Sequence, residues 1–301
     1  MEIINLLLLG AVAGTLAGLL GVGGGIVIVP VFVWIFQSHA EIPITRLMHI
    51  AIGTTLATIV ITSTSSIIAH HRRGAVHWSI VWQLVPGIIV GALLGAVIAD
   101  ALPSETLRVI FAIFILLVSA QLGFGAQRVP HCHTNSDKDI LCSSFTSILS
   151  PQEAREIKPQ TIENNYKLPC NKLGMGLTGA VIGSSSSLVG IGGGSVIVPF
   201  LVWCNVPMRN AVATSAACGF PIAVSGAVGF IATGWHVNEL PAFSSGYIYW
   251  PAFAAIAPTS LLFAPLGAKL VHIIPTGTLK KFFAVFLVGV GFTVICDHFF
   301  Q

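Results

Sequence analysis

Two glycine triplets are the residues of this chain whose spacing points most directly to chemistry. Each triplet follows an apolar run and leads into a second apolar run that contains a proline, and the two copies are a constant 169 residues apart. Glycine adopts positive φ and lets a solute approach the main chain closely. A helix that begins after such a break points its N-terminal N–H groups and positive dipole end toward the break, which favours an anion. The candidate site residues are Gly23, Gly24, Gly25, Gly192, Gly193 and Gly194.

Hydroxyl side chains near both triplets form a second candidate set for binding an anion. A serine run ends shortly before the second triplet, and a Thr or Ser pair lies at matched positions one segment after each triplet. Such groups donate hydrogen bonds to an oxyanion without carrying charge. They can equally bond to a carbonyl three or four residues back in their own helix, so both interpretations stay open. The candidates are Ser186, Ser187, Thr54, Thr55, Thr214 and Ser215.

Close helix packing is the alternative role for glycine in this chain. Gly10, Gly14 and Gly18 are spaced four apart, as in small-residue contacts between membrane helices, and for these three we expect packing. Irregular backbone at membrane depth is tolerated only where protein or a water-filled cavity surrounds it. For the two triplets we expect a solute site, because a repeated triple glycine exceeds what packing needs.

The composition predicts an all-α polytopic membrane protein. Of the residues, 54% are hydrophobic and 8% are charged, against about 25% charged in a soluble domain. A membrane-spanning helix needs about 20 apolar residues. The N-terminal run lacks a positive n-region, so we expect it to be mature structure and not a cleaved signal. The apolar windows, which give 8–10 membrane segments, are 47–69, 79–99, 107–125, 211–233, 243–268 and 279–296, with 3–37 and 173–204 each split by a glycine break.

The duplication extends well beyond the glycines. Ala51-Ile-Gly-Thr-Thr55 matches Ala211-Val-Ala-Thr-Ser215, and the stretch that begins at Pro103 matches the one that begins at Pro275. We therefore expect a first transmembrane repeat at 1–125, a linker at 126–171 and a second transmembrane repeat at 172–301. Each repeat would hold a glycine-broken helical hairpin and three transmembrane helices.

Loop charges predict that the two repeats have inverted topology. Arg72 and Arg73 follow the second segment of the first repeat, and the matching loop of the second repeat carries no Lys or Arg. Because Lys and Arg in short loops stay cytoplasmic, inversion is favoured: it places all but Arg46 and Arg108 of the 14 basic residues inside. Inversion needs an odd number of crossings per repeat, so each broken segment must be a hairpin. Both termini would then face outside and the linker would be cytoplasmic.

Several function classes are disfavoured by what the apolar segments and the linker contain. The segments have no carboxylate at depth and no Gly-x-Ser-x-Gly motif, so we expect no catalytic residues and no enzyme. The net charge of +3 reflects loop residues, and no nucleic-acid partner is expected. The linker sequence His131-Cys132-His133 matches no common zinc spacing. We predict no metal and no cofactor.

The glycine motifs from Gly21 to Pro30 and from Gly190 to Pro199, each followed by the Thr element, resemble those of the sulfite exporter TauE/SafE family of bacterial membrane permeases. The resemblance covers both repeats and excludes the linker. It implies an anion permease, since that family handles sulfite, sulfonates and other small anions. The chain departs from the family pattern at Ala213, where the family often has glycine, and in its long linker with cysteines.

These observations together predict a secondary transporter of small, sulfur-containing oxyanions such as sulfite or a sulfonate. It would work by alternating access across the bacterial inner membrane, with the anion and the lipid bilayer as its partners. Coupling to protons or sodium and the oligomeric state are left open. The alternatives are an anion channel and a non-transporting membrane assembly protein. The inverted repeats also predict a geometry: the two glycine breaks approach the membrane centre from opposite faces and meet.

Overall fold

A computed structural model of the chain describes residues 2–20, 23–37, 43–72, 74–124, 172–237, 240–270 and 288–289. By its contacts the chain divides into one unit of Met1–Gly123 with Lys167–Gln301 and another of Phe124–Tyr166. The predicted linker at 126–171 and nearly all of the predicted segment at 279–296 lie outside the described residues. The fold described below is that of the first unit.

The described residues are almost all helical, as the composition predicts. In the first half the helices are α1 (Glu2–Leu20), α2 (Gly25–Phe36), α3 (Ile44–His71), α4 (Trp78–Ala101) and α5 (Ser104–Phe124). In the second half they are α7 (Lys172–Val189), α8 (Gly194–Trp203), α9 (Met208–Gly234) and α10 (Trp250–Leu270). Proline at the N-cap starts both long helices that follow the broken segments, with Pro43 before α3 and Pro207 before α9.

The predicted apolar window at 243–268 is only partly a helix. Its first residues form a β-hairpin of β1 (Ser244–Ser245) and β2 (Ile248–Tyr249), and α10 begins after it. Phe243 and Gly246 adopt positive φ values of 64° and 55°, which a helix cannot contain. A hydropathy window does not detect such a turn, because it averages these few residues with the apolar helix that follows.

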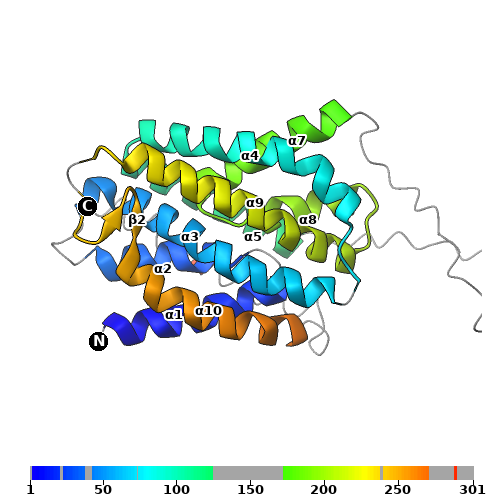
Figure 1. Cartoon of the computed structure of the whole chain (residues 1–301), viewed down its shortest axis with the longest axis horizontal. Helices are drawn as coiled ribbons and strands as arrows, with labels where there is room; N and C mark the ends of the chain where they lie inside the picture. Colours follow the sequence, from blue (N-terminus) through cyan, green and yellow to red (C-terminus); the bar gives the residue numbers. More distant parts are fainter. Residues whose placement is uncertain are drawn as a thin grey trace, which may run out of the picture. The chain divides into compact units, whose positions relative to one another are not determined.

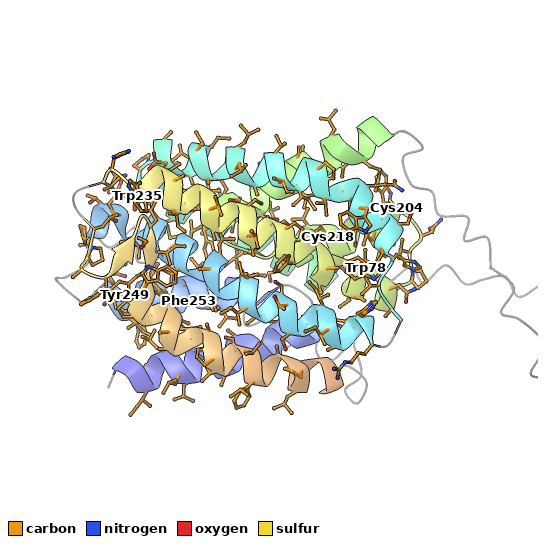
Figure 2. The ribbon with its side chains drawn as sticks, viewed as in Figure 1. Trp78, Cys204, Cys218, Trp235, Tyr249 and Phe253 are labelled. Atoms are coloured by element: carbon orange, nitrogen blue, oxygen red, sulfur yellow. The ribbon has the colours of Figure 1, made fainter. Side chains whose placement is uncertain are left out.

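Four helices in the described part are long and apolar enough to cross a membrane, namely Ile44–His71, Trp78–Ala101, Asn210–Gly234 and Trp250–Gly267. Large apolar side chains such as Val97 on α4 and Leu262 on α10 are exposed, as lipid-facing residues must be. Tryptophans lie at helix ends, and Figure 2 shows Trp78 and Trp235 near opposite ends of the helices. The predicted all-α polytopic membrane fold is confirmed.

Glycines of α1 pack directly against the backbone of α10, with the two helices side by side (Figure 1). A Cβ on Gly10 would lie 2.6 Å from the carbonyl oxygen of Ile256, and one on Gly14 would lie 2.5 Å from that of Ser260. Both positions therefore exclude any side chain. The packing role that the sequence predicts for Gly10 and Gly14 is confirmed.

The same contact recurs with the roles of the halves exchanged. On α7, a Cβ on Gly179 would lie 2.5 Å from the carbonyl oxygen of Leu84, and one on Gly183 would overlap the carbonyl oxygen of Ile88 in α4. Gly179 and Gly183 are the sequence counterparts of the α1 glycines, and α4 is the counterpart of α10. The first helix of each half thus packs on the fourth helix of the other half, as two copies related by a two-fold axis would.

The matched long helices α3 and α9 run antiparallel to each other. The hairpin contacts the early part of α3 through Thr54 and the late part of α9 through Phe230. At the other end, His77, which follows α3, is hydrogen-bonded to Thr214 near the start of α9. Figure 1 shows the same relation, with the hairpin at one end of these helices and the α3–α4 connection at the other. Opposite directions of matched helices support inverted repeats.

Candidate functional site

The two glycine breaks lie in direct contact. A Cβ on Gly23 would stand 3.3 Å from the Cα of Gly192, and a Cβ on Gly25 would overlap the carbonyl oxygen of Gly190. No side chain fits between the two main chains at this point. The predicted meeting of the breaks is what the structure shows, with residues far apart in sequence forming one backbone contact.

Left-handed glycines produce both breaks. Gly24 is the N-cap of α2 with φ 77°, and Gly193 is the N-cap of α8 with φ 75°. Residues with a Cβ rarely adopt this conformation. In the second break, Gly190 (φ 73°) also ends α7 in a Schellman motif. The Gly190 N–H donates to the Ser187 carbonyl, and the Ile191 N–H donates to the Ser186 carbonyl. The spacing of the glycines therefore dictates where each helix stops and the next begins.

The N-termini of α2 and α8 start at this contact without side-chain caps. Gly25 and Gly194 are their first residues, and neither N-cap glycine supplies a capping hydrogen bond from a side chain. The first N–H groups of a helix have no acceptor within that helix, and the helix dipole places partial positive charge there. Two such ends beside one backbone contact make a region that favours a negative charge.

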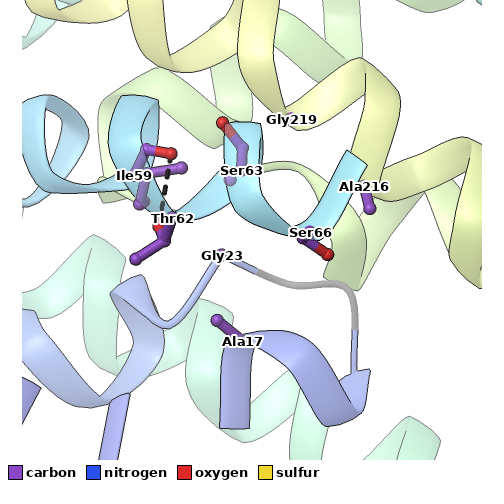
Figure 3. A pocket seen from close by; sticks show the side chains of 9 residues that line it. Ala17, Gly23, Ile59, Thr62, Ser63, Ser66, Ala216 and Gly219 are labelled. Carbon is purple, nitrogen blue, oxygen red and sulfur yellow. Dashed lines mark hydrogen bonds between the residues drawn. The ribbon is translucent and has the colours of Figure 1, made fainter. Parts of the chain in front are cut away.

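A small pocket opens beside the contact and is lined by hydroxyl groups of α3 (Figure 3). Its lining residues are Ala17, Gly23, Ile59, Thr62, Ser63, Ser66, Gly192, Ala216 and Gly219. This lining contains no charged side chain among the described residues. The free space inside is about that of a single water molecule. A solute larger than water therefore requires the surrounding helices to separate.

Ser66 differs from the other hydroxyls of the pocket. Thr62 donates to the carbonyl of Ile59 at 3.2 Å, and Ser63 donates to that of Val60 at 3.1 Å. The Ser66 side chain is 4% exposed, and its Oγ has no hydrogen-bond partner among the described residues. A buried hydroxyl without a partner costs about 1–3 kcal/mol. Ser66 therefore offers a free donor and acceptor at the pocket.

Thr54 and Thr214, which the sequence predicts as solute ligands, each accept a hydrogen bond from the backbone of the opposite half. The N–H of Tyr249, the residue before α10, donates to Thr54 Oγ1 at 3.0 Å. The N–H of His77, the N-cap of α4, donates to Thr214 Oγ1 at 3.1 Å. These two bonds join equivalent positions of the two halves. Each threonine thus holds the start of the fourth helix of the other half.

The remaining predicted hydroxyls divide into two kinds. Thr55 donates to the carbonyl of Ala51 at 2.6 Å and Ser215 to that of Val212 at 2.8 Å, which is the local bonding that the sequence left as an alternative. Ser186 and Ser187 are fully buried, and their Oγ atoms have no partner among the described residues. Neither serine lines the pocket of Figure 3.

The structure adds three pocket residues with hydroxyl groups, Thr62, Ser63 and Ser66, that the sequence analysis did not select. Their signal in the sequence is the run Thr62-Ser-Thr-Ser-Ser66 inside an apolar segment, the counterpart of Ile222 to Gly226 in the second half. Of the residues selected from sequence, Gly23 and Gly192 line the pocket, and Gly24, Gly25, Gly193 and Gly194 form the helix starts around it.

A polar cluster connects the halves at the hairpin end. The buried Tyr247 donates its hydroxyl proton to Asp100 Oδ1 at 2.6 Å and accepts a hydrogen bond from Arg46 Nη1 at 3.2 Å. His49 packs on the Tyr247 ring and lies 3.0 Å, through Nε2, from the carbonyl oxygen of Ala99. Burial, with the hydrogen bond to Asp100, raises the pKa of Tyr247 above its ordinary value. The cluster ties α3 and α4 to the hairpin of the second half.

Comparison with known proteins matches this chain to membrane transporters. A protein named "Probable membrane transporter protein" from Haemophilus influenzae is 35% identical over 285 residues, covering 95% of each chain. "Probable membrane transporter protein YunE" from Bacillus subtilis is 28% identical over the whole of both chains. No solved structure matches the chain significantly. The family model described as "Sulfite exporter TauE/SafE" matches residues 6–294. The chain therefore belongs to the sulfite exporter TauE/SafE family of membrane transporter proteins.

Proposed function

We propose that the protein is a secondary transporter of small, sulfur-containing oxyanions such as sulfite or a sulfonate, and that it moves them by alternating access across the bacterial inner membrane. The observation that carries this proposal is the contact of the two glycine breaks beside the pocket of Ser66. The family description, which names sulfite export, supports the substrate class.

The chemistry of the pocket suits an anion that must be released again. Backbone N–H groups at the starts of α2 and α8 and the free hydroxyl of Ser66 are donors aimed at a negative charge. The lining holds no Lys or Arg among the described residues, so a bound anion would form no direct ion pair with it. Transport needs binding that is strong enough for entry and weak enough for exit. A neutral, donor-rich pocket meets both requirements.

The position of the pocket supports alternating access. Ser66 lies in the last turns of α3, on the side that leads to Arg72, which the charge distribution assigns to the cytoplasm. The polar cluster of Tyr247 and Asp100 lies toward the opposite end of α3, near its first residues. Each long helix of one half is bound to the other half through Thr54 and Thr214. In the mechanism that we propose, the halves rock against each other about the glycine contact, and the linker at 126–171 lies on the cytoplasmic side.

The direct test is a flux screen of the full-length protein in proteoliposomes. Sulfite, thiosulfate, sulfoacetate, taurine and organic acids would be offered with and without a pH or sodium gradient. We expect saturable uptake of a sulfur oxyanion and exchange with the unlabelled anion. Conductance that rises linearly with concentration would identify a channel, and the absence of movement of every solute would favour an assembly protein.

A further inference from the structure

The two sides of the glycine contact are lined by different residues at matched positions. Along α3 and α9 the repeat is offset by a constant 160 residues, which pairs Leu56 with Ala216 and Thr62 with Ile222. Ala216 and Thr62 line the pocket of Ser66, so that side carries a small residue and hydroxyls. Their counterparts, Leu56 and Ile222, are large and apolar. Their side chains fill the space on the other side of the glycine contact.

Leu56 and Ile222 close the space on the hairpin side of the contact. Both side chains are fully buried. Leu56 Cδ1 lies 3.0 Å from the place where a Cβ on Gly226 would stand, and Ile222 Cδ1 overlaps the place of a Cβ on Gly193. Leu56 precedes Ile59 along α3, and Gly226 follows Gly219 along α9, so this space lies beyond the contact from the pocket of Ser66.

Two serine hydroxyls lie beside these apolar side chains. Ser186 Oγ is 3.6 Å from the Cβ position of Gly193, and Ser187 Oγ is 3.1 Å from that of Gly226. Each of these serines is 0% exposed, and neither Oγ has a hydrogen-bond partner among the described residues. Unpaired hydroxyls in a dry interior are unfavourable, and nothing in this conformation uses them.

The hydroxyls on the two sides come from different helices. On one side α3 supplies Thr62, Ser63 and Ser66, and α1 supplies Ala17. On the other side α7 supplies Ser186 and Ser187, at the positions that correspond to Ala17 and Gly18 in α1. The hydroxyl groups therefore come from α3 on one side of the contact and from α7 on the other. Each side keeps at least one hydroxyl without a partner among the described residues, namely Ser66 on the first side and Ser186 and Ser187 on the second.

We propose that Ser186 and Ser187 form a second binding site for the same small oxyanion, and that Leu56 and Ile222 are the gate that covers it. This inference rests on the proposed function and adds a path for the anion, from the pocket of Ser66 to the second site. When the helices on the hairpin side separate, Leu56 and Ile222 move away and the anion passes from Ser66 to the two serines. In the conformation described, the gate is closed.

The test of the site is the double variant Ser186→Ala/Ser187→Ala, compared with Ser184→Ala/Ser185→Ala from the same serine run. Ser184 and Ser185 donate to the Val181 carbonyl and are not buried, so they serve as matched controls. In proteoliposomes we expect a rise of roughly tenfold in the half-saturating anion concentration for the buried pair, and less than about twofold for the control pair. Because neither buried hydroxyl has a partner among the described residues, the thermal midpoint without anion should not fall.

Equal flux curves for both double variants would overturn the second site. If Ser66→Ala still weakens transport in that case, the proposed function stands and only the second site fails. If the wild-type protein itself moves no anion, the proposed function fails.

The gate is tested with a thiol at the covered site. In a background with the native cysteines replaced, Ser187→Cys should react slowly with a membrane-impermeant thiol reagent and several-fold faster when Leu56→Ala is added. Leu84→Ala, an equally buried leucine on α4, is the control and should leave the rate unchanged. Equal rates for the two leucine variants would contradict the gate.

Discussion

Gly23 lies against Gly192, with the place of a Cβ on Gly23 only 3.3 Å from the Cα of Gly192. The two residues come from different halves of the chain, and each lies in a break between two helices. Because no side chain separates the breaks, the N-termini of α2 and α8 share one small region. Motion between the halves must change the space around this contact, which is where the pocket of Ser66 lies.

Ser66→Ala should weaken anion transport without weakening the fold. The Ser66 hydroxyl has no partner among the described residues, so its removal loses no protein hydrogen bond. Loss of one donor to an anion should raise the half-saturating concentration about tenfold, or about 1.4 kcal/mol. Uptake kinetics and the thermal midpoint measure the two effects. Ser65→Ala is the control, because Ser65 points to the carbonyl of Leu261 outside the pocket. A similar loss of affinity in both variants would exclude a direct role for Ser66.

Thr54→Val and Thr214→Val should each lower stability. Valine keeps the shape but leaves the N–H of Tyr249 or of His77 without the threonine acceptor, which costs about 1–2 kcal/mol. Thr55→Val is the control, since its hydroxyl donates to the Ala51 carbonyl within its own helix, and we expect a change within about 0.5 kcal/mol. Thermal unfolding in detergent measures all three. If Thr54→Val changes anion affinity and leaves the midpoint unchanged, Thr54 is a solute ligand and not a structural cap.

Tyr247 should make the protein sensitive to alkali. Burial and the hydrogen bond to Asp100 raise its folded-state pKa above the ordinary value of 10.0. A raised pKa stabilises the fold below the unfolded-state pKa, and this stability is lost as the pH rises above it toward the folded-state pKa. The thermal midpoint should therefore fall as the pH rises above about 10. In Tyr247→Phe we expect a lower midpoint at neutral pH and a shallower fall in alkali. A wild-type slope in Tyr247→Phe would show that the phenol is not responsible.

Inverted topology predicts opposite accessibility for the two ends of the helices. Gly74 lies in the loop between α3 and α4 with open space around it, and Phe243 is 80% exposed beside the hairpin. With the native cysteines replaced, Phe243→Cys should react with an impermeant maleimide in intact cells. Gly74→Cys should react only after the membrane is permeabilised. Labelling of both residues from the same side would exclude the orientation that the loop charges predict.

The sequence predicts the glycine breaks and their contact because both follow from local rules. Triple glycine interrupts an apolar helix. The duplicated motif and the opposite loop charges together predict inverted halves, and in inverted halves the two breaks are expected to meet. The hairpin before Trp250 is not predicted, because hydropathy carries no information about the positive φ of Phe243 and Gly246.

The roles of the hydroxyls depend on partners that no local pattern specifies. The sequence selects Thr54 and Thr214 as solute ligands, and the N–H groups of Tyr249 and His77 that bond to them lie 195 and 137 residues away. Ser66 stands in a serine-rich stretch of a helix where local carbonyl bonding is the usual outcome. Only the fold shows that Ser66 lacks such a bond and faces a pocket.

The central claim is that the contact of the glycine breaks forms the anion site, and one comparison of flux tests it. A Cβ on Gly25 would overlap the Gly190 carbonyl, whereas a Cβ on Gly176 of α7 would meet nothing within 4 Å. Both variants, Gly25→Ala and Gly176→Ala, would be reconstituted at equal density and assayed for saturable uptake of sulfite or the best anion of the screen. We predict that Gly25→Ala inserts normally and loses at least about nine-tenths of the uptake, a barrier of roughly 1.4 kcal/mol or more, while Gly176→Ala transports like the wild type. Wild-type uptake by Gly25→Ala would contradict the account.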